Sequence, residues 1–147
     1  METFMSNLTL DQARQIVADA RAKGRELGLK PLTVAVLDAA GNLKALERED
    51  GASNLRPEIA IGKANGALCM GLGSRALFER AKAEPFFIQA MNELADGSLV
   101  PVPGGVLVKD ASGNTLGAVG ITGDISDNDE TAAVTAIEGA GLVADAG

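Results

Sequence analysis

Four charged side chains that lie close together in the sequence are the first candidates for chemistry: Asp50, Arg56, Glu58 and Lys63. Pro57 is favourable in a first helical turn, so we expect Arg56 and Glu58 at a helix N-terminus and Lys63 further along the helix. The free N–H groups and the dipole there favour an anion. Arg56 offers a planar fork for a carboxylate, while Lys63 offers a point charge or, if burial lowers its pKa, a base. The alternative is that Lys63 forms a structural ion pair with Glu58 or Asp50.

The glycine pair Gly104 and Gly105 is the second candidate. Prolines at positions 101 and 103 stiffen the preceding chain, and two glycines then let backbone N–H groups approach a ligand closely. A plain turn leading into a strand is the equal alternative. We expect one small-molecule pocket bounded by the helix start at Pro57, Lys63 and the glycine pair. In a chain of net charge −7, such a positive cluster favours an anionic ligand.

Acidic residues near the C-terminus are a weaker candidate for a metal site: Asp124, Asp127, Asp129 and Glu130. An EF-hand loop needs a glycine at its sixth position and a glutamate at its twelfth, and neither is in place. Acidic residues at a helix N-terminus are the usual complement to the helix dipole. We therefore predict no metal site.

The residue types that are missing exclude several functions. The sequence has no histidine, so it has no Ser-His-Asp triad, imidazole base or imidazole metal ligand. Its one cysteine, Cys69, forms no intrachain disulfide or zinc thiolate cluster. The net charge of −7 and the four phenylalanines, without tryptophan or tyrosine, argue against nucleic-acid binding. With no secretory signal and no long apolar run, we expect no membrane span and a cytoplasmic protein.

Hydrophobic patterns predict the elements that position these residues. Thr9 and Gln12 form a capping box before a helix that ends near Gly24 or Gly28. Two apolar runs on either side of a turn predict a β-hairpin over residues 32–48, and a similar pattern predicts a second hairpin over residues 106–121. Both turns read Asp-Ala-x-Gly-Asn.

Further helices are predicted after Pro57, Ser74 and Pro85, and from Ser126 to Ala140. Residues 99–103 are a possible short edge strand, since proline is tolerated at sheet edges. Hairpins separated by helices indicate an α+β domain in which helices pack against one antiparallel sheet. We predict a flexible N-terminus over residues 1–7 and one domain over residues 8–147.

The chain resembles the GlcG/HbpS-like family, which also includes the C-terminal domain of PduO-type proteins. The resemblance covers residues 8–143 and rests on several motifs in order: VAVLDAAGN (34–42), REDGA (48–52), IAIGKA (59–64), GGV (104–106), GAVGITG (117–123) and DND (127–129). It implies a sheet of about five antiparallel strands, a homo-oligomer and small-ligand binding beside the Gly104–Gly105 pair. Some members of the family bind haem, and others occur beside corrinoid or glycolate metabolism.

The sequence departs from the haem-binding pattern because histidine and tyrosine, two common ligands of haem iron, are absent. Haem held through histidine is therefore excluded, while haem or corrinoid held by other contacts remains open. Cys69 and Met70 are possible ligands, but the apolar neighbours of Cys69 favour a thiol buried in the core.

Two functions follow as hypotheses. The first is an accessory protein that binds a cofactor or an anionic metabolite and has no catalytic role. The second is a cofactor-free enzyme of the lyase or isomerase type, which grips a small organic acid with Arg56 and transfers a proton through Glu58 or Lys63.

Overall fold

Both predicted hairpins are present in the computed structural model, which describes residues 7–147. The first pairs β1 (Thr33–Asp38) with β2 (Leu43–Arg48), and the second pairs β3 (Gly105–Lys109) with β4 (Thr115–Thr122). The sheet runs β2-β1-β4-β3-β5, and every neighbouring pair is antiparallel. The α+β prediction is confirmed. The predicted flexible segment lies outside the described residues apart from its last member, Asn7.

The two hairpin turns are built in the same way, as their common sequence predicts. In each, the aspartate Oδ1 accepts hydrogen bonds from two backbone N–H groups of the turn, and its Oδ2 accepts one from the asparagine side chain. Gly41 and Gly113 both have a φ of 88°, a conformation that glycine adopts without strain. Local chemistry therefore determines both turns.

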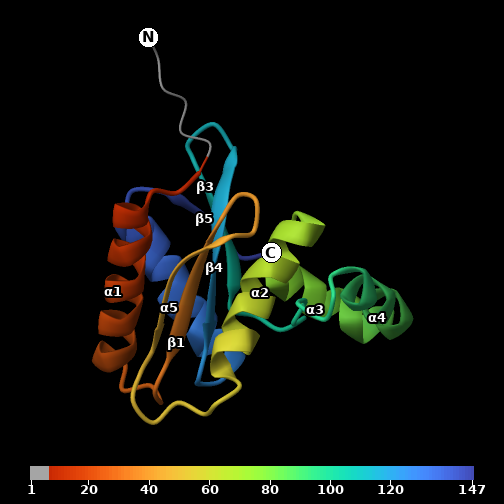
Figure 1. Cartoon of the computed structure of the whole chain (residues 1–147), viewed down its shortest axis with the longest axis horizontal. Coiled ribbons are helices and arrows are strands. Elements are labelled where there is room, and N and C mark those ends of the chain that lie inside the picture. Colours follow the sequence, from red (N-terminus) through yellow and green to blue (C-terminus); the bar gives the residue numbers. More distant parts are fainter. Residues whose placement is uncertain (1–6) are drawn as a thin grey trace.

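Helices cover both faces of the sheet (Figure 1): α1 and α5 lie on one face and α2 on the other, while α3 and α4 extend beyond α2. The capping box starts α1, and prolines in the first turn start α2 and α4. The helix bounds are Leu10–Glu26 for α1, Arg56–Met70 for α2, Ser74–Ala83 for α3, Pro85–Leu94 for α4 and Ser126–Gly139 for α5.

The strands bury side chains on both faces of the sheet. Val34, Val36 and Val119 belong to the larger core, which includes residues of α1 and α5. Leu37 and Ala118 belong to a smaller core with residues of α2. Because side chains alternate between the faces of a strand, the odd positions of β1 and residues 118, 120 and 122 of β4 face α2.

The helix α2 packs unusually close to the sheet because glycines face it. A Cβ placed on Gly120 would lie 1.9 Å from the carbonyl oxygen of Ala60, and one on Gly105 would lie 2.2 Å from that of Lys63. Neither distance is sterically possible, so only glycine fits at these positions. Gly120 and Gly105 therefore permit the close packing of α2 on the sheet.

One prediction about the sheet edge is wrong. Residues 99–103 form no strand, because Leu99 is buried between α3 and α4 and the N–H of Val100 donates to the carbonyl of Gly62 in α2. The fifth strand is β5 (Val143–Asp145), which pairs with β3. The predicted C-terminal helix ends one residue early, at Gly139.

Candidate ligand-binding site at the end of the sheet

Arg56 begins α2 beside the last residue of β4. Its Nη1 donates to Oγ1 of Thr122 at 2.8 Å, and its Nε donates to Oγ of Ser53 at 3.1 Å. The side chain is half-buried, and no side chain caps this end of α2. A guanidinium is thus held against the sheet end, and anion binding there stays a prediction.

Lys63 lies at the same end of the sheet but is only 2% exposed. Its Nζ donates to the carbonyl of Ile121 at 2.8 Å and to Oδ2 of Asp129 at 3.3 Å. The expected partners, Glu58 and Asp50, are therefore wrong. The ion pair joins α2 to α5, and so it connects the helical layers on the two faces of the sheet.

Burial acts on both members of this ion pair. Desolvation lowers the pKa of Lys63, against the attraction of Asp129, and it raises the pKa of Asp129, against the attraction of Lys63. Arg56 also lowers the pKa of Lys63 through Coulomb repulsion. Of these two cations, Asp129 neutralises Lys63, and only Arg56 reaches the surface.

The glycine pair lies directly against Lys63. Gly104 has a φ of 121°, and a Cβ there would be 2.9 Å from Nζ of Lys63. The N–H of Gly105 donates to Oγ of Ser74 at 2.7 Å, so it is already satisfied. The predicted convergence of Lys63 with the glycines is present, while contact of either glycine with a ligand stays a prediction.

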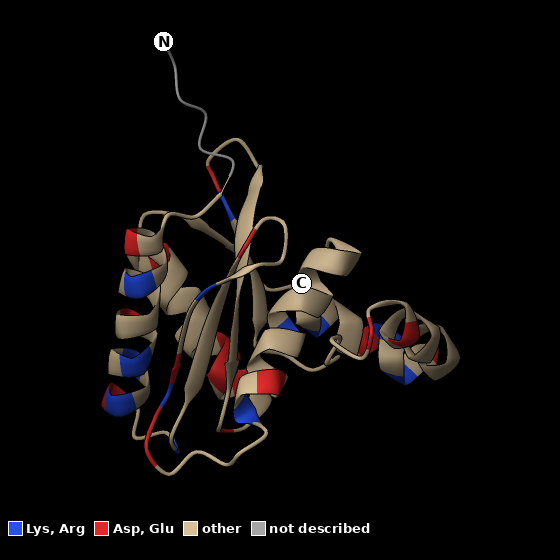
Figure 2. Cartoon of the chain, viewed as in Figure 1, with Lys and Arg blue, Asp and Glu red and all other residues tan. Residues whose placement is uncertain are grey.

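The other two predicted charged residues, Glu58 and Asp50, do not contact Lys63. Glu58 is exposed in the first turn of α2, where Figure 2 shows charges of both signs. Asp50 is exposed and lines a groove of about 210 Å³ with Arg21 and Arg25 of α1. The structure groups Asp50 with α1 and does not bring it into contact with Lys63.

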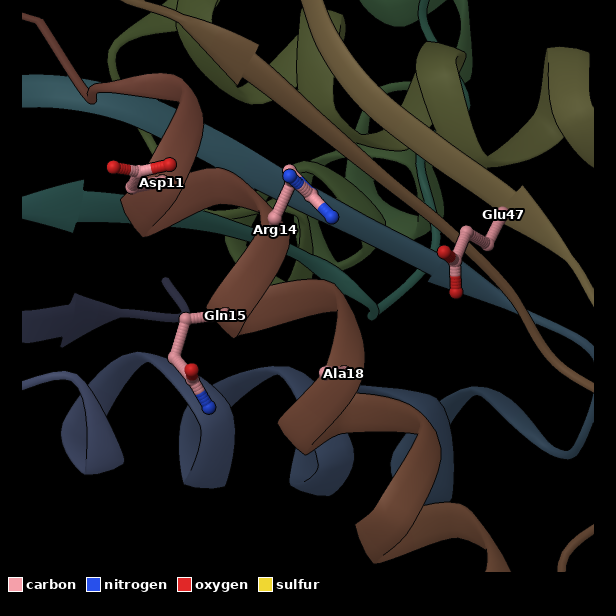
Figure 3. Close-up of a pocket in the computed structure, with 5 residues that line it drawn as sticks. All are labelled: Asp11, Arg14, Gln15, Ala18 and Glu47. Carbon is pink, nitrogen blue, oxygen red and sulfur yellow. The ribbon is translucent and has the colours of Figure 1, made fainter.

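Two further cavities were not predicted. One cavity of about 440 Å³ lies between α1 and β2, with Arg14 and Glu47 on opposite sides (Figure 3). It is lined by Asp11, Arg14, Gln15, Ala18 and Glu47. The other, of about 190 Å³, lies where α3 meets the start of α5 and is lined by Phe78, Val102, Pro103, Ile125, Ser126 and Asp127. The smaller one adjoins the glycine pair through Pro103.

Comparison with known proteins places this architecture in a family. Residues 8–138 match the family model described as haem degrading protein HbpS-like. The chain belongs to the HbpS-like family. The crystal structure of a PduOC:heme complex is 25% identical, with a TM-score of 0.79 over 90% of this chain and 94% of that one. The crystal structure of HbpS is also 25% identical, with a TM-score of 0.79 over 94% of this chain and 92% of that one.

A curated protein of Citrobacter freundii is also similar. It is described as an uncharacterized 15.0 kDa protein in the dhaT-dhaS intergenic region, and it is 26% identical over 136 residues, which cover 91% of this chain and 92% of that protein. The likeness to the HbpS-like family therefore extends over almost the full length of the relatives.

The candidate haem ligands of this HbpS-like chain lie elsewhere on α2. Cys69 is exposed, which corrects the expectation of a buried core thiol. Helix geometry explains this: two residues after buried Ala67, a side chain points about 200° away around the helix. Met70 is half-buried against the α3–α4 core. Neither residue lines a cavity described above.

The acidic residues at the start of α5 are engaged within the protein. Arg75 bonds to Asp127 and Glu130, and Asp129 pairs with Lys63. Within residues 7–147, no three side chains of the metal-ligating types come together as a metal site. No helix in that part of the chain is both long and apolar enough to cross a bilayer.

Sequence reasoning missed two threonines at this end of the sheet. Thr122 accepts the hydrogen bond from Arg56, and Thr33 lies directly opposite Thr122 in the β1–β4 register. Both are buried. Threonine is an ordinary strand residue, so the sequence carries no signal that distinguishes these two from the others.

Proposed function

We propose that this HbpS-like protein binds a small anionic ligand at the end of the sheet where α2 begins. The observation that carries the proposal is Arg56, a half-buried guanidinium fixed against Thr122 beside an uncapped helix N-terminus. This guanidinium charge stands out in a chain whose net charge is −7. Such a local reversal of potential concentrates an anion at one place on the surface.

Haem is the ligand of the PduOC relative, and its two propionates are carboxylates of the kind that Arg56 binds. The site has no suitable ligand for the haem iron. The sequence has no histidine or tyrosine, Cys69 is exposed on the last turn of α2, and Met70 packs against α3 and α4. The site residues therefore fit a carboxylate and do not fit haem iron, so a small acid is the better candidate.

An accessory binding role is favoured over catalysis by the state of Lys63. Its Nζ is buried between Asp129 and the carbonyl of Ile121, so a proton acceptor in solution does not reach it. Glu58 is the exposed group that could transfer a proton, and the cofactor-free enzyme remains the second hypothesis through that residue. The proposed homo-oligomer is supported by exposed apolar side chains on α4, Phe86 and Leu94.

The test compares Arg56→Ala with Arg14→Ala. Arg14 is exposed and lines the cavity of about 440 Å³, so its removal changes the charge equally at the rival location. Titration with sodium acetate and sodium glycolate, followed by amide NMR shifts, is expected to show binding that Arg56→Ala abolishes and Arg14→Ala leaves intact. The reverse pattern would place the ligand in the α1 cavity and overturn the proposal.

A further inference from the structure

Thr33 carries a buried polar atom that the fold leaves unsatisfied. Its side chain is 0% exposed, and within residues 7–147 its Oγ1 has no hydrogen-bond partner. Buried hydroxyls in proteins are nearly always hydrogen-bonded, because an unpaired one has lost its bonds to water. An unpaired hydroxyl at this position needs an explanation, and a hydrogen bond to a bound ligand is one.

Thr33 lies next to the residues of the proposed anion site. Thr33 and Thr122 are directly opposed across β1 and β4, and both face α2 by the alternation of strand side chains. Thr122 in turn accepts the hydrogen bond from Nη1 of Arg56. Two hydroxyls and one guanidinium therefore meet under the first turn of α2.

The donors of this group exceed its acceptors. A guanidinium has five N–H donors, and Arg56 uses its Nε and Nη1 in the two bonds to Ser53 and Thr122. The hydroxyl of Thr33 is a further unused donor. An ionised carboxylate is acceptor-only, with two oxygens in a plane that matches the guanidinium fork.

We infer that Thr33, Thr122 and Arg56 form a subsite for the carboxylate group of a small ligand, with Thr33 as a contact residue that the site otherwise lacks. This inference rests on the proposed function and specifies its ligand. Because Thr33 and Thr122 are buried, ligand binding there requires the Arg56 side chain to leave Thr122 and uncover the two hydroxyls.

The same surroundings favour a carboxylate over a phosphate. Glu58 adds a negative charge in the first turn of α2, which opposes a dianion more than a monoanion. The ligand class is therefore a small carboxylic acid, either free or as the propionate of a larger molecule.

The experiment uses Thr33→Val, which keeps the shape of the side chain and removes its hydroxyl. Thr115→Val is the matched control, since Thr115 is half-buried at the opposite end of β4. Wild-type protein and both variants are titrated with sodium acetate, sodium glycolate and sodium phosphate, with amide NMR shifts as the readout. We expect acetate or glycolate to shift the amides at residues 33, 56 and 122. Thr33→Val should weaken that binding about tenfold or more, the loss typical of a hydrogen bond to a charged group, without lowering the melting temperature.

The outcomes separate the two proposals. Unchanged binding in Thr33→Val, together with loss in Arg56→Ala, overturns the Thr33 subsite and retains the proposed function. No acetate or glycolate shifts at the start of α2 overturn both. Tighter binding of phosphate than of either acid overturns the carboxylate assignment. A parallel titration with haem, followed by absorption, identifies the source: haem binding that Thr33→Val weakens indicates a propionate, and binding of the small acids alone indicates a free acid.

Discussion

Two buried polar groups lie at the same end of the sheet and differ in one respect. Lys63 is closed within the protein, because Asp129 and the Ile121 carbonyl satisfy it and Gly104 covers it. Thr33 is left without a partner in the described residues and lies beside a guanidinium that reaches the surface. The lysine has the more reactive functional group, yet the threonine is the one with unused hydrogen-bonding capacity. The comparison teaches that unsatisfied hydrogen-bonding groups indicate a binding site better than residue type does. An ionisable side chain that lies at the site, such as Lys63, can have a purely structural role.

The largest expected loss of stability comes from breaking the buried ion pair between Lys63 and Asp129. Asp129→Asn keeps the oxygen that accepts from the N–H of Asp124 but leaves the Lys63 ammonium buried without its counter-charge. Removing one partner of a buried ion pair costs about 3–5 kcal/mol. We expect the free energy of unfolding, measured by urea denaturation, to fall by about that amount.

The double variant Lys63→Met with Asp129→Asn is the control for that prediction. It removes the buried charge while an unbranched apolar chain fills the space of the lysine stem. Removing both charges of a buried ion pair costs less than leaving one of them unpaired, so the double variant should recover part of the loss. If the double variant were as unstable as the single one, Lys63 would contribute mainly through packing and hydrogen bonding to Ile121.

A smaller loss is expected at the residue that covers the lysine. Gly104→Ala introduces a Cβ 2.9 Å from Nζ of Lys63 and 2.6 Å from the carbonyl oxygen of Ile121, at a φ of 121° that side chains rarely adopt. Strained backbone of this kind costs about 1–3 kcal/mol. Thermal denaturation measures the loss. Gly113→Ala is the matched control, since it also has a positive φ but open space around its Cβ position, and it separates backbone strain from crowding of Lys63. Equal losses in the two variants would show that Gly104 has no specific role as a cover.

The sequence predicted those parts of the fold that depend on local chemistry. The hairpins follow from apolar runs and from two identical turn patterns, in which each aspartate bonds within its own turn. The strand β5 was missed because its three residues are too few to show an alternating pattern. Leu99 was placed in a strand because its apolar character was visible in the sequence, whereas its packing partners in α3 and α4 were not.

The site was predicted only in part, for the same reason. Arg56 and Lys63 were identified by residue type and by the helix start, but the partner of Lys63 comes from another layer of the molecule, 66 residues along the chain. Asp129 was assigned to the helix dipole because it follows other acidic residues. Thr33 was missed because the lack of a partner is a property of the assembled fold, and no sequence pattern records it.

The smallest effect concerns Asp124, a half-buried neighbour of the Lys63–Asp129 pair. Asp124 accepts hydrogen bonds from the N–H of Lys30, the side chain of Asn128 and the N–H of Ile125, and these lower its pKa to about 2 from the ordinary 3.8. A carboxylate with a lowered folded-state pKa contributes stability that is present above its unfolded pKa and is lost as the pH falls through the folded one. We therefore expect Asp124→Asn to lower the melting temperature slightly at neutral pH, and the difference from wild type to shrink as the pH falls from about 3.8 to about 2. Asp129, one turn away, has its pKa raised by burial, so its contribution changes with pH in the opposite sense. A difference between wild type and Asp124→Asn that grew toward acid would show that Asp124 acts mainly by raising the pKa of Asp129, and that the two carboxylates form one coupled group.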